Sequence, residues 1–354
     1  MMFDFETVIK NLDLGNLAAQ PQRVTGGYLH KMFKLETTTG KYAVKLLNPV
    51  IMKRPGVLED YKRAEHIEQI LSEYNIPIVP ALEIHGARMQ RLDGQYLYIY
   101  EWTDAKALGW HGIKEEHCEA VGKLLAHIHN IPLHGFHSDE TCQSCSKMNC
   151  GIPVSYQLSD RKFHVDWDCY IRLAKKMHSE LAEELEKNRE LFYRAQQEYN
   201  TAVDNVPDIV CITDGDMDCK NVLWKNGQPL IIDLECLDYG NPFLEMFQLA
   251  LSWAGDAVCD IHFGRMDSFL RAYQSEYGKI DVDWEALSGV GFSWLDWLEY
   301  NTKRALLIEC GDEEEQKLGI CEAKETIRRI VYYHSVRESM LEYLSRTENS
   351  NSLI

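Results

Sequence analysis

Short apolar runs separated by turn residues fill the first third of the chain and predict a small antiparallel sheet. Residues 32–35 and 41–47 read as strands joined by the turn at 38–40, and residues 98–102 form a further strand. Residues 58–74 repeat apolar positions at helical spacing, which predicts a helix. The core face expected for that helix consists of Leu58, Ile67, Ile70 and Leu71.

The remainder of the chain carries helical rather than alternating periodicity. A chain of 354 residues with 45% hydrophobic content can bury two cores, so two lobes are expected, at residues 1–102 and 103–354. The fold class is therefore α+β, with a small antiparallel sheet lobe and a larger, mainly helical lobe. Residues 312–315 read as a solvated turn and 347–354 as a frayed tail. The helices expected in the second lobe are residues 167–199, 243–254, 260–277, 292–309 and 324–344.

An Asn-Gly pair at residues 226–227 lies between two apolar runs and predicts a β-hairpin. A two-residue turn pairs position 221 with 232, whereas a three-residue loop with a bulge sets 221 opposite 233. Either register returns Asp233 towards Asn221.

Asp216 lies five residues before Asn221, and the hairpin returns a second carboxylate, Asp233, beside them. Phosphoryl transfer from a nucleotide requires such a set. One carboxylate accepts the proton of the attacking hydroxyl, while the amide and the second carboxylate hold Mg²⁺ against the phosphates. The alternative is a polar loop followed by an aspartate that ends a strand. Against this alternative, an ionisable residue directly after the run at 229–232 needs a metal or an ion pair.

Lys45 lies among apolar neighbours inside the strand at 41–47, which predicts a buried ammonium that needs an anion. Glu65, on the predicted helix, is the candidate anion. Gly26 and Gly27 form a turn upstream, and the lysine suggests that their backbone amides cover phosphates. The alternatives are an ordinary lysine on an edge strand and an ordinary glycine turn.

Charge is divided unevenly along the chain. Residues 1–102 carry no net charge, and the whole −18 falls on residues 103–354. A field of this sign disfavours nucleic acid and anionic membrane surfaces as partners and favours a cationic small-molecule ligand. The alternative is that the acidic surface only keeps the protein in solution.

Two tryptophans three residues apart on a predicted helix, Trp294 and Trp297, can form one wall of a cleft for such a ligand. Aromatic rings at this spacing are otherwise typical of a core. Carboxylates flank these rings or follow Asp233 in sequence. The candidate substrate residues are Glu235, Asp238, Asp256, Trp294, Asp296, Trp297 and Glu299.

No apolar stretch approaches the length of a membrane span and the first residues lack a secretory leader, so we expect a cytoplasmic protein. Eleven scattered cysteines read as reduced thiols. Cys142, Cys145 and Cys150, with His134 and His137 nearby, resemble half a zinc site, but no second Cys-x-x-Cys pair accompanies them. We therefore expect free thiols and no stoichiometric zinc there.

Together these residues resemble the aminoglycoside phosphotransferase and choline kinase group of small-molecule kinases, which share the two-lobed protein-kinase-like fold. The resemblance runs over residues 26–344 and includes the helix at 121–129. Gly240-Asn241-Pro242 with Glu245 resembles the family's Gly-Asp-Pro and the acidic residue after it. The resemblance implies a nucleotide between the lobes and a hydroxylated acceptor on the helical side.

The resemblance assigns a role to each motif residue. Lys45 resembles the lysine that contacts the nucleotide phosphates, and Glu65 resembles its helix partner. Asp216 corresponds to the catalytic base, and Asn221 and Asp233 correspond to the magnesium ligands. The residues that resemble the adenine-binding hinge are Tyr100, Glu101 and Trp102.

Two departures from the family pattern concern the catalytic loop and the motif after it. The loop histidine, two residues before the base, is Asp214 here, and a second common histidine is Asp218. Extra carboxylates close to Asp216 are expected to raise the proton affinity of at least one of them. Asn241 replaces the Asp of Gly-Asp-Pro and affects only a supporting contact.

The expected activity is transfer of the γ-phosphate of ATP, with GTP as the alternative, to a hydroxyl of a small cationic molecule, with Mg²⁺ as cofactor. An aminoglycoside-like aminosugar is the favoured acceptor. A metabolic kinase for a choline-like or sugar substrate shares every motif. A nucleotide-binding regulator with weak turnover is the alternative from another class.

Overall fold

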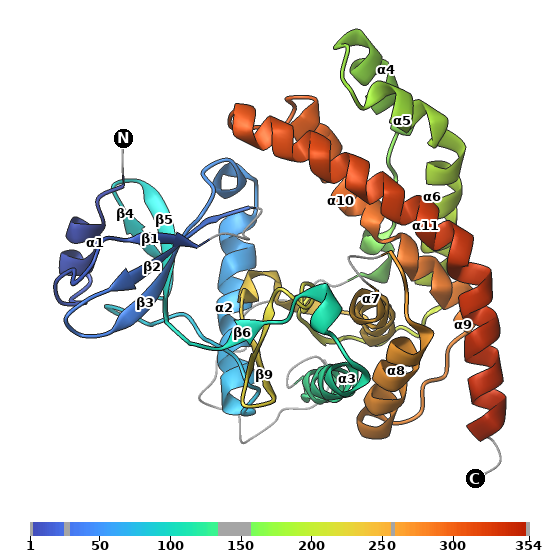
Figure 1. The fold of residues 1–354 in the computed structure, drawn as a ribbon, viewed down its shortest axis with the longest axis horizontal. Coiled ribbons are helices and arrows are strands. Elements are labelled where there is room, and N and C mark those ends of the chain that lie inside the picture. The colour runs from blue at the N-terminus through green and yellow to red at the C-terminus, as the bar shows by residue number, and fades with distance from the viewer. Residues whose placement is uncertain (1–2, 25–28, 134–156, 256–258, 352–354) are drawn as a thin grey trace. The chain divides into compact units, whose positions relative to one another are not determined.

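The computed structural model describes residues 3–24, 29–133, 157–255 and 259–351 (Figure 1). Several residues singled out in the sequence lie outside these ranges. They are Gly26, Gly27, His134, His137, Cys142, Cys145, Cys150 and Asp256.

The chain forms two compact units. The first consists of Met1–Ala107 and Asn221–Leu237, and the second of Leu108–Lys220 and Asp238–Ile354. The expected division at 102/103 differs from this arrangement, because the first unit also takes the hairpin from the later part of the chain.

A five-stranded antiparallel sheet, in the order β1-β2-β3-β5-β4, forms the base of the first unit. β2 (Lys31–Glu36) and β3 (Lys41–Leu46) form the predicted hairpin, and β3 also pairs with β5 (Gln95–Glu101). The shorter strands β1 (Gln22–Val24) and β4 (Gln90–Leu92) complete the sheet. The strands predicted from short apolar runs between turns are thus confirmed.

A helix covers each face of this sheet (Figure 1). On one face, Ile9 of α1 (Phe5–Asn11) and Ile99 of β5 belong to the same buried cluster. On the other face, Tyr98 belongs to a separate cluster beneath α2 (Val57–Glu73). Successive residues of β5 therefore enter opposite cores, as the two-residue period of a strand requires.

The core face predicted for residues 58–74 is confirmed in part. Ile67 and Leu71 are fully buried, whereas Leu58 and Ile70 are only half-buried. Tyr61 and Ala64 supply the rest of the apolar face of α2, and they precede Ile67 at helical spacing.

The predicted Asn-Gly hairpin is present as β8 (Val222–Lys225) and β9 (Gln228–Ile231). Residues 226–227 have φ values of 53° and 77°, which suit a two-residue type I′ turn. Ile232 donates its N–H to the Asn221 carbonyl (2.9 Å), so the register that pairs 221 with 232 is the observed one.

Backbone hydrogen bonds join this hairpin to the rest of the first unit. Ile231 donates to the Pro77 carbonyl (2.8 Å) and accepts from the Val79 N–H (2.9 Å). β6 (Lys106–Ala107) also pairs with β8. These partners are far apart in sequence, which explains why a division by composition did not assign the hairpin to this unit.

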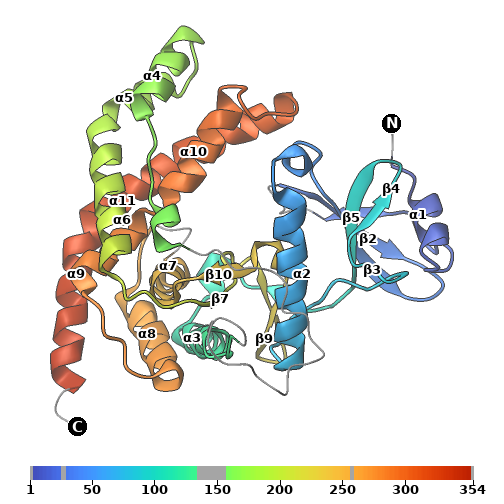
Figure 2. The ribbon, with the colours of Figure 1, turned by 180° about the vertical axis from the view of Figure 1, so that it is seen from behind.

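The second unit is mainly helical, with α3 packed along α8 and α10 along α11 (Figure 2). Its short strands β7 (Cys211–Thr213) and β10 (Asp238–Gly240) pair antiparallel. None of the helices in the described ranges is both long enough and apolar enough to cross a membrane. The α-helices are α3 (Glu115–His129), α4 (Trp167–Lys176), α5 (Ala182–Lys187), α6 (Arg189–Asn205), α7 (Pro242–Ala254), α8 (Phe263–Tyr277), α9 (Trp284–Leu287), α10 (Trp294–Ala305) and α11 (Glu313–Asn351). The 3-10 helices of the two units are η1 (Ile51–Lys53), η2 (Trp110–Gly112), η3 (Leu158–Arg161), η4 (Leu234–Cys236) and η5 (Ser288–Phe292).

Residues 167–199 are helical as expected, but three helices, α4, α5 and α6, divide this segment. His178, with φ of 52°, adopts the left-handed conformation just after α4. A residue in that conformation commonly ends a helix, and the spacing of apolar residues does not predict where this happens.

The acidic run at residues 312–315 is not a solvated turn but the beginning of α11. Asp312 accepts a hydrogen bond from the Glu315 N–H (2.9 Å) and so caps the helix. Negative side chains in the first helical turn are also favoured by the helix dipole. The same helix continues to Asn351, through part of the predicted frayed tail.

Gly122 allows α3 and α8 to approach closely. A Cβ at this position would lie 2.5 Å from the Phe269 carbonyl oxygen and 3.3 Å from the Tyr273 backbone nitrogen. Both are backbone atoms, so α8 itself would have to shift to make room. Packing, rather than backbone conformation, therefore requires glycine here.

We expect Gly122→Ala to lower the free energy of unfolding by about 1–3 kcal/mol through overpacking. This loss opposes the intrinsic helix preference of alanine over glycine, which is about 1 kcal/mol. The matched control is Gly264→Ala in α8, where a Cβ would meet only the flexible Glu115 carboxylate (2.8 Å). Denaturant unfolding of both variants measures the effect, and a Gly122→Ala protein as stable as wild type would contradict it.

Candidate active site

Lys45 lies on the face of the sheet that α2 covers. It is opposite Tyr98 in the register, whereas its neighbours Val44 and Leu46 enter the cluster on the α1 face. Lys45 is only 3% exposed, so its predicted burial is confirmed. A buried ammonium requires compensating negative charge nearby.

Two carboxylates of the first unit supply this charge. Asp233 and Glu235 both form ion pairs with the Lys45 ammonium. Asp233 follows β9 with φ of 67° and begins η4, which packs on α2. The left-handed conformation of Asp233 turns the chain, so that the side chains of Asp233 and Glu235 both contact the Lys45 ammonium.

The three charges shift one another's pKa. Burial opposes charge on Lys45, but Asp233 and Glu235 outweigh it and raise the pKa of the amine. Burial would also raise the pKa of Asp233, yet Lys45 holds this pKa below its usual range. Burial and the charge of Asp233 raise the pKa of Glu235. Asp233 is therefore the stronger anion beside a firmly charged lysine.

The prediction that Glu65 is the partner of Lys45 is wrong. Glu65 Oε1 instead accepts hydrogen bonds from the Tyr98 hydroxyl (2.8 Å) and the Met89 N–H (3.1 Å). The carboxylate of Glu65 thus satisfies polar groups of the sheet and the segment before it. The charge on Lys45 is compensated from the hairpin instead.

His30 lies on the other side of Glu235. Its Nδ1 accepts the Asn48 N–H (3.0 Å), which leaves the proton of the neutral ring on Nε2. That nitrogen lies 3.8 Å from Glu235 Oε1 and 3.4 Å from the Tyr61 hydroxyl. Burial lowers the pKa of His30 to about 3, and the charge of Lys45 contributes in the same direction. Sequence reasoning missed His30, because nothing local connects it to a hairpin some 200 residues later.

The predicted hinge residues end β5. Tyr100 is buried on the α2 side, and burial together with Glu235 raises the pKa of its phenol. Glu101 is exposed, while the Trp102 ring lies 4.8 Å from the Lys34 ammonium. The assignment of these residues to adenine stays a prediction.

The loop after β7, in the second unit, carries Asp216. Asp214 is buried, and its Oδ1 accepts the Asp216 N–H (3.1 Å), so an aspartate at the family's histidine position braces the loop backbone. Lys220 lies 3.2 Å from Asp216 and 3.0 Å from Asp218. Burial opposes charge on Lys220, but the two carboxylates raise its pKa. A cation thus offsets the added negative charge of the loop.

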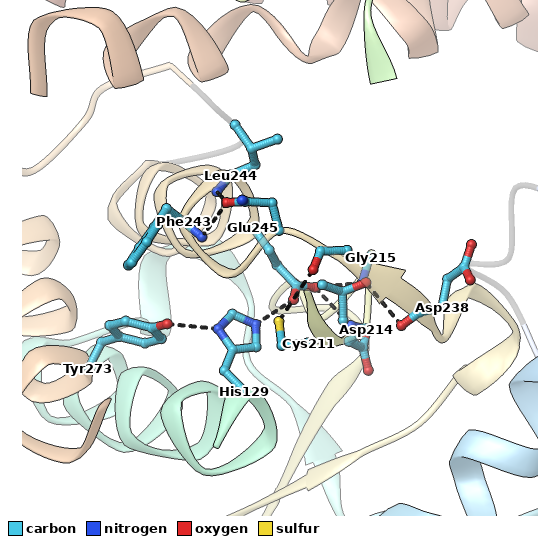
Figure 3. Close-up of polar contacts among 12 residues, drawn as sticks. His129, Cys211, Asp214, Gly215, Asp238, Phe243, Leu244, Glu245 and Tyr273 are labelled. Atoms are coloured by element: carbon cyan, nitrogen blue, oxygen red, sulfur yellow. Dashed lines mark hydrogen bonds and ion pairs between the residues drawn. The ribbon is translucent and has the colours of Figure 1, made fainter. Parts of the chain in front are cut away.

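Glu245 of α7 holds the start of this loop (Figure 3). Its Oε1 accepts the N–H groups of Asp214 (2.8 Å) and Gly215 (2.6 Å), and its Oε2 lies 2.8 Å from His129 Nε2. The ring of His129 is also hydrogen-bonded through Nδ1 to the Tyr273 hydroxyl (2.8 Å). A carboxylate only accepts, so Nε2 donates to Glu245 and, in the neutral ring, Nδ1 accepts from Tyr273. This series of hydrogen bonds connects α3, α7 and α8 to the loop.

The motif around Glu245 was visible in the sequence, but its partners were not. His129 reaches Glu245 from a helix more than a hundred residues earlier, and Tyr273 contacts His129 from α8. Asn241, the other departure from the family, accepts the N–H groups of Phe243 (3.0 Å) and Leu244 (3.4 Å) and so caps α7. The substitution of Asp by Asn therefore keeps the cap.

Two of the predicted substrate carboxylates, close in sequence, belong to different units. Glu235 is buried in the first unit, where Lys45 already occupies the place that a substrate cation would take beside it. The assignment of Glu235 to a cationic substrate is therefore wrong. Asp238 lies on β10 of the second unit, where the Arg161 guanidinium approaches to 3.6 Å.

The predicted tryptophan wall packs against α11. The Trp294 ring lies 4.7 Å from the Arg329 guanidinium, and Trp297 Nε1 donates to Glu322 (3.2 Å). Both rings are half-buried. These contacts favour the alternative in which the two rings are packing residues.

The acidic residues beside the tryptophans differ in exposure. Glu299 accepts the Tyr170 hydroxyl (2.7 Å) and pairs with Lys303 (3.0 Å), one helical turn later. Asp296 is exposed on α10. A role for either in substrate binding stays a prediction.

The comparisons with known proteins bear on both units. A model described as the phosphotransferase enzyme family matches residues 21–290. No curated protein matches the chain.

Solved structures resemble the chain over nearly its whole length. A spectinomycin phosphotransferase in complex with ADP and spectinomycin has a TM-score of 0.62 at 12% identity, and the match covers 94% of this chain and 99% of that one. Amicoumacin kinase in complex with AMP-PNP, Ca²⁺ and Ami has a TM-score of 0.55 at 11% identity and coverages of 92% and 94%. An ethanolamine kinase from Plasmodium vivax has a TM-score of 0.55 at 16% identity and coverages of 91% and 86%. These likenesses show the two-lobed, protein-kinase-like α+β fold.

The neutral state of His30 makes stability depend on pH. Its folded pKa of about 3 lies below the ordinary value of 6.5, so its contribution is complete above pH 6.5 and is lost as pH falls towards 3. Between pH 7.5 and 5.5 this group should remove about 1.4 kcal/mol from the free energy of unfolding. We expect the free energy of unfolding of His30→Gln to fall by about 1.4 kcal/mol less than that of wild type between pH 7.5 and 5.5.

Denaturant titrations at the two pH values, in the presence of EDTA, measure the difference. The same substitution at the exposed His127 is the control for a generic effect of replacing histidine. Equal losses in wild type and His30→Gln would show that His30 is not held neutral by burial.

Proposed function

Because the chain belongs to the phosphotransferase enzyme family, we propose that it transfers the γ-phosphate of ATP or GTP to a hydroxyl of a small cationic molecule. The observation that carries this proposal is the ion pair between the buried Lys45 and Asp233 in the first unit. A lysine held at a fixed place beside a carboxylate suits the binding of nucleotide phosphates and their metal ion.

The residues of the hairpin fit a magnesium site. The Asp233 carboxylate and the Asn221 amide both offer oxygen, the donor that Mg²⁺ prefers. Among the described residues no three His, Cys, Asp or Glu side chains converge as a metal site, so phosphate and water oxygens would complete the coordination. Magnesium, when bound, neutralises charge on the phosphoryl group that is transferred.

Asp216 is the proposed base. Its carboxylate is partly exposed, whereas its backbone is fixed by Asp214 and, through the preceding residues, by Glu245. A fixed carboxylate can orient an acceptor hydroxyl and take its proton as the oxygen attacks phosphorus. Lys220, 3.2 Å from this carboxylate, offsets part of the negative charge of the loop.

The proposed acceptor is a hydroxyl-bearing amine. The entire −18 of the chain lies in residues 103–354, which favours cations over anionic ligands. Spectinomycin and ethanolamine, named for two of the similar structures, are of this chemical class. Asp238, Asp296 and Glu299 are the remaining described candidates for the amine.

We expect Asp216→Asn to lower kcat by about 10²–10⁴-fold while nucleotide binding survives, because the base is lost and the metal ligands are kept. Asp233→Asn should instead weaken Mg²⁺-dependent nucleotide binding. Transfer of radiolabelled phosphate to a panel of hydroxylated amines and calorimetric nucleotide titration separate the two effects.

Asp218→Asn is the matched control, because Asp218 shares the Lys220 contact but lies two residues further along the loop. It should change kcat far less than Asp216→Asn. Wild-type turnover by Asp216→Asn would disprove the assignment of the base. Nucleotide binding without transfer to any acceptor would favour a regulator.

Binding of a cationic acceptor should weaken as salt concentration rises, since screening reduces attraction between charges. The double variant Asp296→Asn, Glu299→Gln should raise the KM for the acceptor more than it lowers kcat. The charge-matched control replaces the exposed Glu313 and Glu314 with Gln. Phosphorylation of neutral or anionic sugars alone, independent of salt, would contradict a cationic acceptor.

A further inference from the structure

The anions that compensate Lys45 come from the hairpin and not from α2. Both Asp233 and Glu235 contact the ammonium, and the Glu235 side chain is only 9% exposed. An ammonium has three N–H donors. Two are engaged by these carboxylates, which leaves one for a phosphate oxygen.

The glutamates of α2 have other partners. Glu65 accepts from Tyr98 and Met89, as described above. Glu68, one turn later, accepts from the Arg88 guanidinium (2.5 Å) and the Ala81 N–H (3.1 Å). Both side chains attach α2 to the segment between the helix and β5. Turning either one to Lys45 would leave buried donors without an acceptor, which typically costs about 1–3 kcal/mol.

Glu235, in contrast, lies between Lys45 and the neutral ring of His30. Lys45 contacts it on one side, and His30 Nε2 lies 3.8 Å from its Oε1 on the other. η4, which carries Glu235, packs on α2 and begins at the left-handed Asp233. The backbone of η4 therefore positions this carboxylate independently of any ligand of Asp233.

We propose that Glu235 is the residue that positions Lys45 for the nucleotide phosphates, in place of a glutamate from α2. This inference rests on the proposed nucleotide site. Asp233 has a second task there, because its carboxylate is the proposed metal ligand. Glu235 has no such second task, so its contact with the buried ammonium can hold Lys45 at a fixed place.

The test compares Glu235→Gln with Glu65→Gln, the same change on α2. Glu235→Gln should weaken binding of the Mg²⁺–ATP complex by about tenfold or more and raise the KM for ATP, while the KM for the acceptor stays constant. Glu65→Gln should change either quantity by less than about threefold, although it lowers thermal stability. Equal effects of the two substitutions, or a larger effect of Glu65→Gln, would overturn the inference.

A double-mutant cycle with Lys45→Met separates positioning from general damage to the fold. If Glu235 acts through Lys45, Glu235→Gln should add less than about twofold to the loss of ATP affinity caused by Lys45→Met. Additive losses would overturn the inference. Should Glu235→Gln not fold, Glu235→Asp in the same cycle keeps the charge but retracts it, and its loss should also vanish in the Lys45→Met background.

The failure of the proposed function has a different signature. Tight ATP binding without transfer to any acceptor would reject the proposed activity and leave the cycle interpretable, because its readout is nucleotide affinity. No ATP binding by the wild-type protein would reject both.

Discussion

The burial of one positive charge determines much of the first unit. Lys45 lies between a sheet and a helix, where an uncompensated ammonium is strongly unfavourable. The chain supplies the compensation from the far end of a hairpin nearly two hundred residues later. This requires the hairpin to join the first unit through Pro77 and Val79, and it requires Asp233 to adopt a left-handed conformation. The ion pair thus connects the fold to the position of the proposed metal ligand.

A separate constraint organises the second unit. The loop with Asp216 begins at a pair of amides that both donate to Glu245, and this carboxylate is itself fixed by His129 and Tyr273. Buried polar groups of this kind are costly when unpaired and rigid when fully paired. A loop that must hold one carboxylate at a reacting hydroxyl benefits from such rigidity. Asp214 continues the bracing by accepting the N–H of Asp216.

Both departures from the family pattern are accommodated by neighbouring residues. Lys220 contacts Asp216 and Asp218, so the negative charge that replaces the loop histidines has a local counter-ion. Asn241 caps α7 as an aspartate would. These features agree with a loop that retains its architecture after its composition has changed.

The sequence by itself determined the elements whose cause is local. The strands around Lys45 follow from short apolar runs between turns, and the hairpin at residues 226–227 follows from the φ values that Asn and Gly adopt. The sequence left two registers open for this hairpin, and the structure selects the one that pairs 221 with 232. It also indicated that Lys45 needed an anion. Only the tertiary structure decided which anion, because Glu65 and Glu235 are equally acidic in sequence and differ only in the donors that surround them once the chain is folded. The same holds for His30, whose position beside Glu235 depends on packing between residues distant in sequence.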